Sequence, residues 1–422
     1  MHDAPLRHSR VIDRSPVPYA WVVLAAALVT TMMTVPGQTI GVSVFLDPIL
    51  VDLGATRSTV SLLYTIGTLI GSFVLPFVGR FVDRRGPRLG VAVVAGAFAL
   101  ACLYMSSVAS LAMLAVGFVL IRGLGQGSLS LVGLHVVNLW FVRRRGLAIG
   151  LLGLGMSIAT AFFPPLLERL IATLGWRASY AAMAAAVALI AVPLGVTFFR
   201  GRPEEYGERP DGHRPRTPTD ADAVDEMDLS LGQARRTAAF WFVTVGDVAV
   251  AALGTGLVFH HFDILGVSGV DRATAAAVFV PLGLVTAGAN VGTGALLDRM
   301  PPRFALAAML AFLSGALVLA GWVSPLWLPV YGVLVGLAQG MKGAISGSAY
   351  AYYFGRRHIG SIKGFATTIS VAGTAIGPLV FAVGRDVSGS YLPVLLLSAL
   401  VPAVLAVASL ALRPPRRVDA AS

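Results

Sequence analysis

The sequence predicts an all-α polytopic membrane protein in which twelve transmembrane helices form two pseudo-symmetric six-helix bundles. Three observations predict this fold class. Only 13% of the 422 residues are charged and 56% are hydrophobic, whereas soluble domains carry about 25% charged residues. Apolar runs long enough to cross a bilayer recur along the whole chain. Several motifs also return after a nearly constant interval of sequence.

The apolar runs define the expected helices in order. They cover residues 19–45, 59–79, 88–108, 110–137, 146–172, 176–199, 238–262, 273–297, 304–323, 326–353, 362–384 and 390–412. The first run is too long for the apolar core of a signal peptide and lacks a small-residue cleavage site, so we expect it to remain as the first helix. Within it, Pro36-Gly37 interrupts the run just before Gln38 and Thr39. This break is either a packing kink or an opened helix beside a site.

The basic residues are distributed unevenly between the segments that connect the runs. With a cytoplasmic N-terminus, the inner segments hold 25 of the 32 Lys and Arg residues and the outer segments hold five. This asymmetry is the positive-inside rule, and it explains the net charge of +11 without nucleic acid. We therefore expect a multi-pass protein of the cell (plasma or inner) membrane with both termini in the cytoplasm.

The chain repeats itself about halfway along. The stretch GRFVDRRGPR at 79–88 returns as GALLDRMPPR at 294–303, and GLGQG at 123–127 returns as GLAQG at 336–340. Several matches at nearly one offset imply a duplicated six-helix unit. We therefore expect an N-terminal bundle at 1–199, a C-terminal bundle at 238–422, and a cytoplasmic connector at 200–237, whose polar, Pro-rich composition does not support a packed core.

These motifs carry a family resemblance. GRFVDRRGPR resembles the signature of the major facilitator superfamily between helices 2 and 3, through Gly79, Asp83, Arg84, Gly86 and Arg88. Within that superfamily, RGRPEEYGERPDG, VFHHFDILGVSG and GQTIGVSVFLDPIL resemble the bacterial oxalate/formate and monocarboxylate transporter branch. The resemblance implies the major facilitator fold and transport by alternating access between the halves.

Two features depart from that branch. The run 273–297 contains no basic residue, although the branch is associated with one in helix 8. Lys363 lies at the start of helix 11 rather than deep within it. Either Lys342 on helix 10 takes over the contact to the anion, or the substrate differs from oxalate. A monocarboxylate therefore fits better than a dianion.

Three ionisable residues lie near the middle of apolar runs, namely Arg122, Asp247 and Lys342. A charge at the centre of a membrane helix costs about 2.5–3.5 kcal/mol, so such residues usually serve a function. One aspartate neutralises only one of the two cations. Either an anionic substrate answers the remaining charge, or the residues form a structural pair and a water-exposed cation.

Spacing and resemblance extend the candidate set. The substrate-binding candidates are Arg122, Lys342, Gln38, Gln126, Gln339, Tyr64, Ser346 and Tyr350. The proton-coupling candidates are Asp247, His260 and His261, although the two histidines, with Asp263, are also ordinary interfacial polar residues. The gating candidates, implied by the resemblance, are Asp83, Arg84, Arg88, Asp298 and Arg299.

The sequence thus favours a secondary active transporter of a small organic anion, best a monocarboxylate, with proton symport as an open possibility. One alternative is proton-driven export of a drug or other hydrophobic compound, but the fifth run lacks the Gly-Pro motif that such exporters carry. Another is an intramembrane enzyme using His135 or the His260, His261 and Asp263 cluster. We expect no enzyme activity, cofactor, bound metal or nucleic-acid partner. The expected surroundings are the lipid bilayer, and the expected state is a monomer.

Overall fold

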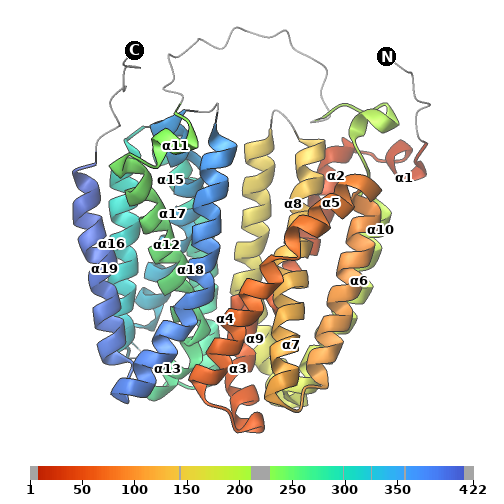
Figure 1. Ribbon diagram of the computed structural model, residues 1–422. Helices are drawn as coiled ribbons and strands as arrows, with labels where there is room; N and C mark the ends of the chain where they lie inside the picture. Colours follow the sequence, from red (N-terminus) through yellow and green to blue (C-terminus); the bar gives the residue numbers. More distant parts are fainter. Residues whose placement is uncertain are drawn as a thin grey trace. The chain divides into compact units, whose positions relative to one another are not determined.

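A computed structural model describes residues 8–141, 144–210, 229–297, 299–324, 326–355 and 358–412. The chain divides into two compact units, Met1–Thr217 and Pro218–Ser422, which we call unit 1 and unit 2 and describe separately. Within the described residues each unit is built from helices and contains no strand (Figure 1).

Unit 1 begins with a short helix and continues with long apolar ones. Its helices are α1 (Arg10–Asp13), α2 (Tyr19–Met32), η1 (Val35–Gly37), α3 (Thr39–Leu53), α4 (Arg57–Ser72), α5 (Leu75–Arg85), α6 (Pro87–Ser106), α7 (Leu111–Ile121), η2 (Arg122–Leu129), α8 (Ser130–Trp140), α9 (Arg145–Ala186), η3 (Val187–Ala191), α10 (Val192–Phe198) and η4 (Pro203–Tyr206). The segments η1 and η4 are 3₁₀ helices, and η2 and η3 are π-helical.

Unit 2 also consists mainly of long apolar helices. Its helices are α11 (Leu231–Ala234), α12 (Ala238–Phe259), α13 (His261–Val267), α14 (Arg272–Ala277), α15 (Phe279–Leu297), α16 (Pro302–Gly321), α17 (Leu328–Phe354), α18 (Ile359–Ser388) and α19 (Leu392–Leu410). Of the proposed connector, η4 and α11 belong to the described residues, whereas 211–228 lie outside them.

The helices account for the twelve predicted spans. Ten continuous helical stretches in the described residues are long and apolar enough to cross a membrane. One of them, Gly146–Phe198, holds two spans, because Gly175 adopts φ 80° and ψ 162° inside α9, a conformation that favours glycine. The first span is not among the ten, since η1 interrupts it between α2 and α3. The total is therefore twelve, with six in each unit.

The polar stretch at 79–88 is mostly helical and is not an extended loop between spans. The helix α5 continues through Asp83 to Arg85, and α6 starts at Pro87, so only Gly86 separates them. Gly86 has φ 81°, and this lets the chain turn within one residue. The positive charges therefore lie on the ends of two helices rather than on an extended segment.

Small and aromatic residues pack the interior of each unit. In unit 1, Phe45 stacks on Tyr180 with 4.0 Å between ring centroids, and Tyr19 lies against Trp140. In unit 2, α12 packs on α17 and α18, while α15 packs on α17. Large apolar residues such as Leu189 are exposed on the outside of the helices. Lipid tails cover such side chains in a membrane, so this exposure is expected of a spanning bundle.

Candidate functional site

The guanidinium of Arg122 is the centre of a polar cluster inside unit 1. Arg122 is buried, with only 2% of its surface exposed. Its Nε donates to the hydroxyl of Thr68 at 2.9 Å, and its Nη1 donates to the main-chain carbonyl of Gly37 at 2.9 Å. The guanidinium carbon also lies 4.5 Å from the centroid of the Tyr64 ring, a cation–π distance. Residues from the first and second spans therefore fix the position of this side chain, which belongs to the fourth.

The break in the first span supplies one of these contacts. Pro36 lacks an N–H group, and the chain forms the 3₁₀ segment η1 before the helix restarts at Thr39. The N–H group of Gly41, which would bond to the carbonyl of Gly37 in a continuous helix, instead donates to Gln38. The Gly37 carbonyl is thus left for Arg122. Of the two interpretations of this break, the structure favours a helix opened beside a buried charge.

Close helix packing at Gly37 makes this contact possible. A Cβ atom on Gly37 would lie 2.3 Å from the carbonyl oxygen of Ile121, well inside any normal contact. The first and fourth spans therefore approach each other at their backbones, as small residues permit in membrane bundles. Only glycine fits at this position.

Tyr64 and Thr68 belong to α4 and lie one helical turn apart. Tyr64 is fully buried, and its hydroxyl shares a 2.7 Å hydrogen bond with that of Thr39. Thr68 was not a sequence candidate. The four-residue spacing of two polar residues in an apolar run was a signal that could have identified it.

Within the described part of the chain, one edge of the Arg122 guanidinium has no hydrogen-bond partner. Its Nη2 atom is buried without a hydrogen bond, and within the described residues no carboxylate forms an ion pair with it. Leaving a buried polar group unpaired costs about 1–3 kcal/mol, and more for a charged one. A carboxylate or phosphate oxygen is the natural acceptor for this donor.

The glutamine candidates near Arg122 do not bond to it. Arg122 opens η2, a π-helical segment that also contains Gln126. Gln38 donates from Nε2 to the hydroxyl of Thr34 at 3.0 Å. Within the described residues, neither glutamine forms a hydrogen bond to Arg122. Gln38 and Gln126 therefore stay candidates for contacts to a substrate rather than to Arg122 itself.

The second buried ionic cluster lies in unit 2, between α12 and α17. The Nζ atom of Lys342 lies 3.5 Å from Oδ1 of Asp247. The hydroxyl of Ser346 donates a short hydrogen bond to the same oxygen. Asp247 is 8% exposed, while the side chain of Lys342 keeps 24% of its surface accessible. The pairing partner of Asp247 is thus Lys342, and the lysine retains an open side.

The remaining candidates on α17 also face α12. The hydroxyl of Tyr350 lies 3.1 Å from that of Thr244. A Cβ atom on Gly254 would lie 2.6 Å from Nε2 of Gln339, so that amide rests directly on α12. The structure therefore places Gln339, Lys342, Ser346 and Tyr350 along one face of the helix.

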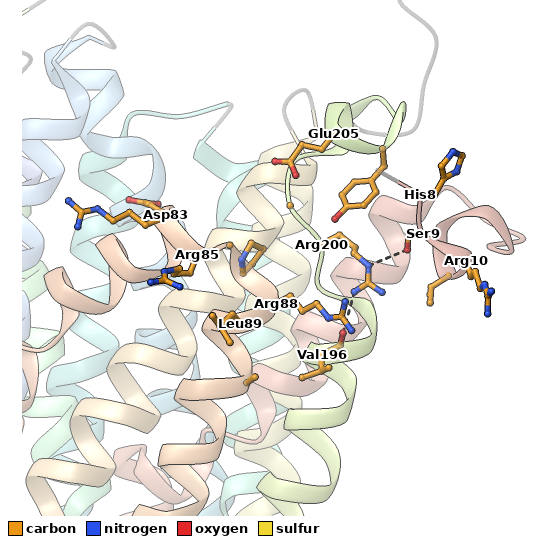
Figure 2. Close-up of a pocket in the computed structure, with 17 residues that line it drawn as sticks. His8, Ser9, Arg10, Asp83, Arg85, Arg88, Leu89, Val196, Arg200 and Glu205 are labelled. Carbon is orange, nitrogen blue, oxygen red and sulfur yellow. Dashed lines mark hydrogen bonds between the residues drawn. The ribbon is translucent and has the colours of Figure 1, made fainter. Parts of the chain in front are cut away.

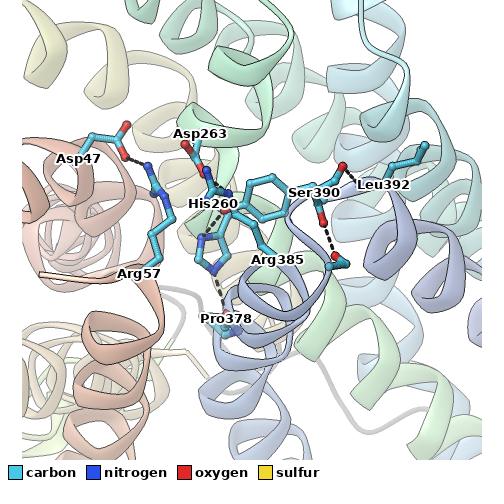
Figure 3. A network of polar contacts seen from close by, with 10 residues as sticks. Asp47, Arg57, His260, Asp263, Pro378, Arg385, Ser390 and Leu392 are labelled. Carbon is cyan, nitrogen blue, oxygen red and sulfur yellow. Dashed lines mark hydrogen bonds and ion pairs between the residues drawn. The ribbon is translucent and has the colours of Figure 1, made fainter.

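The two histidines of unit 2 are satisfied by other protein groups. His260 and His261 are fully buried. The Nε2 atom of His260 lies 2.8 Å from the carbonyl of Pro378, and its Nδ1 lies 3.3 Å from the hydroxyl of Tyr391 (Figure 3). A carbonyl only accepts, so Nε2 carries the proton and Nδ1 accepts from the tyrosine. This arrangement supports a structural role for the neutral ring.

His261 repeats the same pattern. Its Nε2 atom lies 2.9 Å from the carbonyl of Ala275, and its Nδ1 lies 3.3 Å from the hydroxyl of Tyr331. Asp263, the third member of this cluster, forms an ion pair with Arg385 at 3.2 Å (Figure 3). Among the described residues no three His, Cys, Asp or Glu side chains are grouped as metal ligands.

The gating candidates lie at the charged end of their helices. Oδ1 of Asp83 lies 3.8 Å from Nδ1 of His135 on α8, and Asp83 is well exposed. Arg84 and Arg88 are also exposed, on α5 and at the start of α6. Arg299 follows α15, in a turn closed by its N–H bond to Leu296. Asp298 lies outside the described residues.

Glu168 is a buried acid that the sequence candidates omit. It lies on α9 and is 9% exposed. Its position in the apolar run 146–172 was the available signal, since ionisable residues are costly in such runs.

Comparison with known proteins identifies the family. The profile of the Major Facilitator Superfamily matches residues 22–378. The oxalate:formate antiporter of Oxalobacter formigenes is 26% identical over 224 residues, which cover 52% of this chain and 50% of the antiporter. Monocarboxylate transporter 6 of Mus musculus is 30% identical over 175 residues, covering 41% of this chain and 36% of that transporter. The chain thus spans half or less of these two relatives.

Two further proteins match over more of their length. The MFS transporter asaE of Aspergillus flavus is 24% identical over 343 residues, which cover 80% of this chain and 73% of that transporter. The crystal structure of a bacterial homologue of the human lysosomal transporter Spinster, inward-facing and occupied, has a TM-score of 0.67 at 18% identity, with 94% of this chain and 96% of that chain covered. The apolar spans and the profile match agree, and this chain is a multi-pass membrane protein that belongs to the major facilitator superfamily of transporters.

Proposed function

We propose that the protein is a secondary active transporter of a small monocarboxylate, which it moves by alternating access. The observation that carries the proposal is the guanidinium of Arg122, which is buried and held by neutral acceptors, with Nη2 unpaired. A single carboxylate would satisfy the free edge and neutralise the charge. The relatives named for oxalate, formate and monocarboxylates support the same class of substrate.

The Lys342–Asp247 pair supports proton coupling. While Asp247 is ionised, Lys342 has a partner at 3.5 Å. A proton on Asp247 removes that ion pair and leaves the ammonium with an unanswered charge. The lysine then attracts an anion, so proton and substrate would bind together and cross together. The hydroxyl of Ser346 would keep the carboxyl in place in either state.

The histidines and the remaining candidates have supporting roles in this proposal. His260 and His261 hold the outer end of α12 through carbonyl and tyrosine contacts, so Asp247 is the preferred proton site. Tyr64 orients Arg122 through its ring, and Tyr350 orients the α12 side of the second cluster through Thr244. Gln38, Gln126 and Gln339 remain candidates for contacts to the uncharged part of the substrate.

Ligand binding to the purified full-length protein tests the proposal. The melting temperature is measured with formate, acetate and lactate and with the neutral amides of the same acids. A ligand that binds only the folded protein raises its melting temperature. We expect at least one acid to raise it while the matching amide does not, because the amide lacks the charge that Arg122 requires.

Two variants sharpen this test. The affinity of Arg122→Gln for the stabilising acid should be about tenfold or more below that of the wild type, because one charge-assisted contact is lost. Arg169→Gln, which removes an exposed arginine of α9, should keep wild-type affinity. If Arg122→Gln is poorly folded, Thr68→Val removes the acceptor of Nε, together with the hydroxyl's own bond to the Tyr64 carbonyl, and should weaken binding less. Equal stabilisation by acids and amides would contradict the proposal.

A further inference from the structure

A second polar site lies in unit 1, separate from the Arg122 cluster. It is a cavity of about 1010 Å³ at the end of the bundle, where α5 meets α6 (Figure 2). Three segments that are distant in sequence line it, namely 8–11, 83–92 and 196–206. The transport proposal does not depend on this cavity, although three gating candidates, Asp83, Arg84 and Arg88, line it.

The cavity has a strong excess of positive charge. Its lining includes five arginines, Arg10, Arg84, Arg85, Arg88 and Arg200. Only two acids line it, Asp83 and Glu205. Asp83 also faces His135, whose Nδ1 atom lies 3.8 Å from Oδ1 of Asp83. The cavity therefore carries three more arginines than acids.

Arg200 is built into the wall of the cavity. It is only 7% exposed. Its Nη1 donates to the carbonyls of Phe199 at 2.8 Å and Val196 at 3.3 Å, and its Nε donates to the hydroxyl of Ser9 at 3.3 Å. These acceptors are neutral, so they fix the guanidinium without cancelling its charge. No carboxylate in the described part of the chain forms an ion pair with Arg200.

Arg88 adds a second charge to the same place. It is exposed, and its side chain is directed to the part of the cavity that holds Arg200 (Figure 2). Two like charges that approach each other repel, and a bound anion between them removes this cost. Arg88 and Leu89 also belong to the first turn of α6, a helix of 20 residues that starts at Pro87. The N–H groups of a first turn lack helix partners and favour an anion.

We propose that this cavity binds a phosphate group, and that its source is the headgroup of an anionic phospholipid. Guanidinium groups pair with phosphate oxygens through two parallel hydrogen bonds, which suits Arg88 and Arg200. The cavity lies at the end of the spanning helices, the level of lipid headgroups, and basic pockets there attract anionic lipids. A bound phosphate would join the N-terminal segment at Ser9 to the start of α6 and the end of α10.

Lipid binding to the full-length protein in detergent tests this site. The probes are dioleoyl phosphatidylglycerol, dioleoyl phosphatidylcholine and inorganic phosphate, and the readouts are native mass spectrometry and the melting temperature. We expect phosphatidylglycerol to bind and to raise the melting temperature, and phosphatidylcholine to bind about tenfold or more weakly. Arg88→Gln and Arg200→Gln should each weaken the binding of phosphatidylglycerol about tenfold. Arg14→Gln, an exposed arginine outside the cavity, is the matched control and should stay within about twofold of the wild type.

The outcomes separate the source of the phosphate from the site itself. If inorganic phosphate binds as tightly as phosphatidylglycerol and both depend on Arg88, the site stands and its ligand is a soluble phosphate. If Arg200→Gln does not fold, the exposed Arg88→Gln variant still decides the question. The proposal would be overturned if phosphatidylglycerol and inorganic phosphate each bound Arg88→Gln and Arg14→Gln as tightly as they bind the wild type. These readouts do not include monocarboxylate binding, so a failure of the proposed transport function would not change the result for this cavity.

Discussion

The guanidinium of Arg122 donates a 2.9 Å hydrogen bond to the main-chain carbonyl of Gly37, at the break in the first span. This contact ties the fourth span to the first through an oxygen that a continuous helix would have used internally. The bond depends on the close approach of two backbones, which a side chain at residue 37 would prevent.

Gly37→Ala should therefore destabilise the protein and weaken substrate binding together. The new methyl group would lie 2.3 Å from the carbonyl oxygen of Ile121, so the two spans must separate. Overpacking of this kind costs about 1–3 kcal/mol, which should appear as a lower melting temperature. Gly96→Ala on α6 is the control, because its Cβ atom would meet nothing within 4 Å. A Gly37→Ala protein as stable as Gly96→Ala would show that the two spans can move apart without loss.

Asp247→Asn should uncouple transport from protons. In the wild type we expect uptake of the carboxylate into proteoliposomes to accelerate as the external pH falls, since a protonated Asp247 releases Lys342. In Asp247→Asn this acceleration should disappear, while exchange of labelled for unlabelled carboxylate continues. Asp271→Asn, at an exposed helix cap, should keep the wild-type pH profile.

Lys342→Gln provides the complementary measurement. Removal of the ammonium should sharply reduce uptake at every pH, because the charge that attracts the anion in the proposed coupling is lost. Wild-type uptake rates in Lys342→Gln for every acid transported would remove Lys342 from the mechanism.

Asp83→Asn should change the rate of transport more than the affinity for substrate. Asp83 lies at the charged end of α5, and its Oδ1 is 3.8 Å from Nδ1 of His135. Among the described residues, the hydrogen bonds of Arg122 go to Thr68 and Gly37 and not to Asp83. If it acts as a gate, its loss alters how fast the protein changes state. Concentration-dependent uptake gives the maximal rate and KM separately. A large change in KM at constant maximal rate is the result that this role does not allow.

Asp52 gives a pH-dependent prediction outside the apolar runs. A 2.6 Å hydrogen bond from Arg177 holds the pKa of the Asp52 carboxyl below its usual value. Because the folded pKa is depressed, the stabilisation is fully present above the pKa of the unfolded chain and is lost as the pH falls through the folded pKa. Asp52→Asn should lower the melting temperature at pH 7, and the difference should shrink below about pH 5. A difference that is constant with pH would assign the effect to something other than this carboxylate.

Much of the fold was readable from the sequence because membrane spans have a simple length and composition. The break at Pro36-Gly37 was also predictable, because proline and glycine interrupt a helix. Lys342 and Asp247 were found as costly charges in apolar runs, and the spacing on the tenth span placed Gln339, Ser346 and Tyr350 beside Lys342.

The partners of these charges required the three-dimensional structure. The carbonyl of Gly37 has no signature in the sequence, because every residue has one and only packing brings it to Arg122. The pairing of Lys342 with Asp247, rather than with another acid, depends on how α12 packs on α17. The sequence left His260 and His261 as either proton-coupling or ordinary polar residues, and it contains no sign of the carbonyl and tyrosine partners that surround both rings.

Whether Arg122 binds the substrate is tested by uptake of a labelled monocarboxylate into proteoliposomes that contain wild type, Arg122→Gln, Arg122→Lys or Arg169→Gln. We expect Arg122→Gln to lose about 90% or more of the uptake, which corresponds to about 1.4 kcal/mol or more. Arg122→Lys, which keeps the charge but not the paired donors, should retain partial activity, and Arg169→Gln should take up the acid normally. Wild-type uptake of every transported acid by correctly folded Arg122→Gln would show that Arg122 does not bind the substrate.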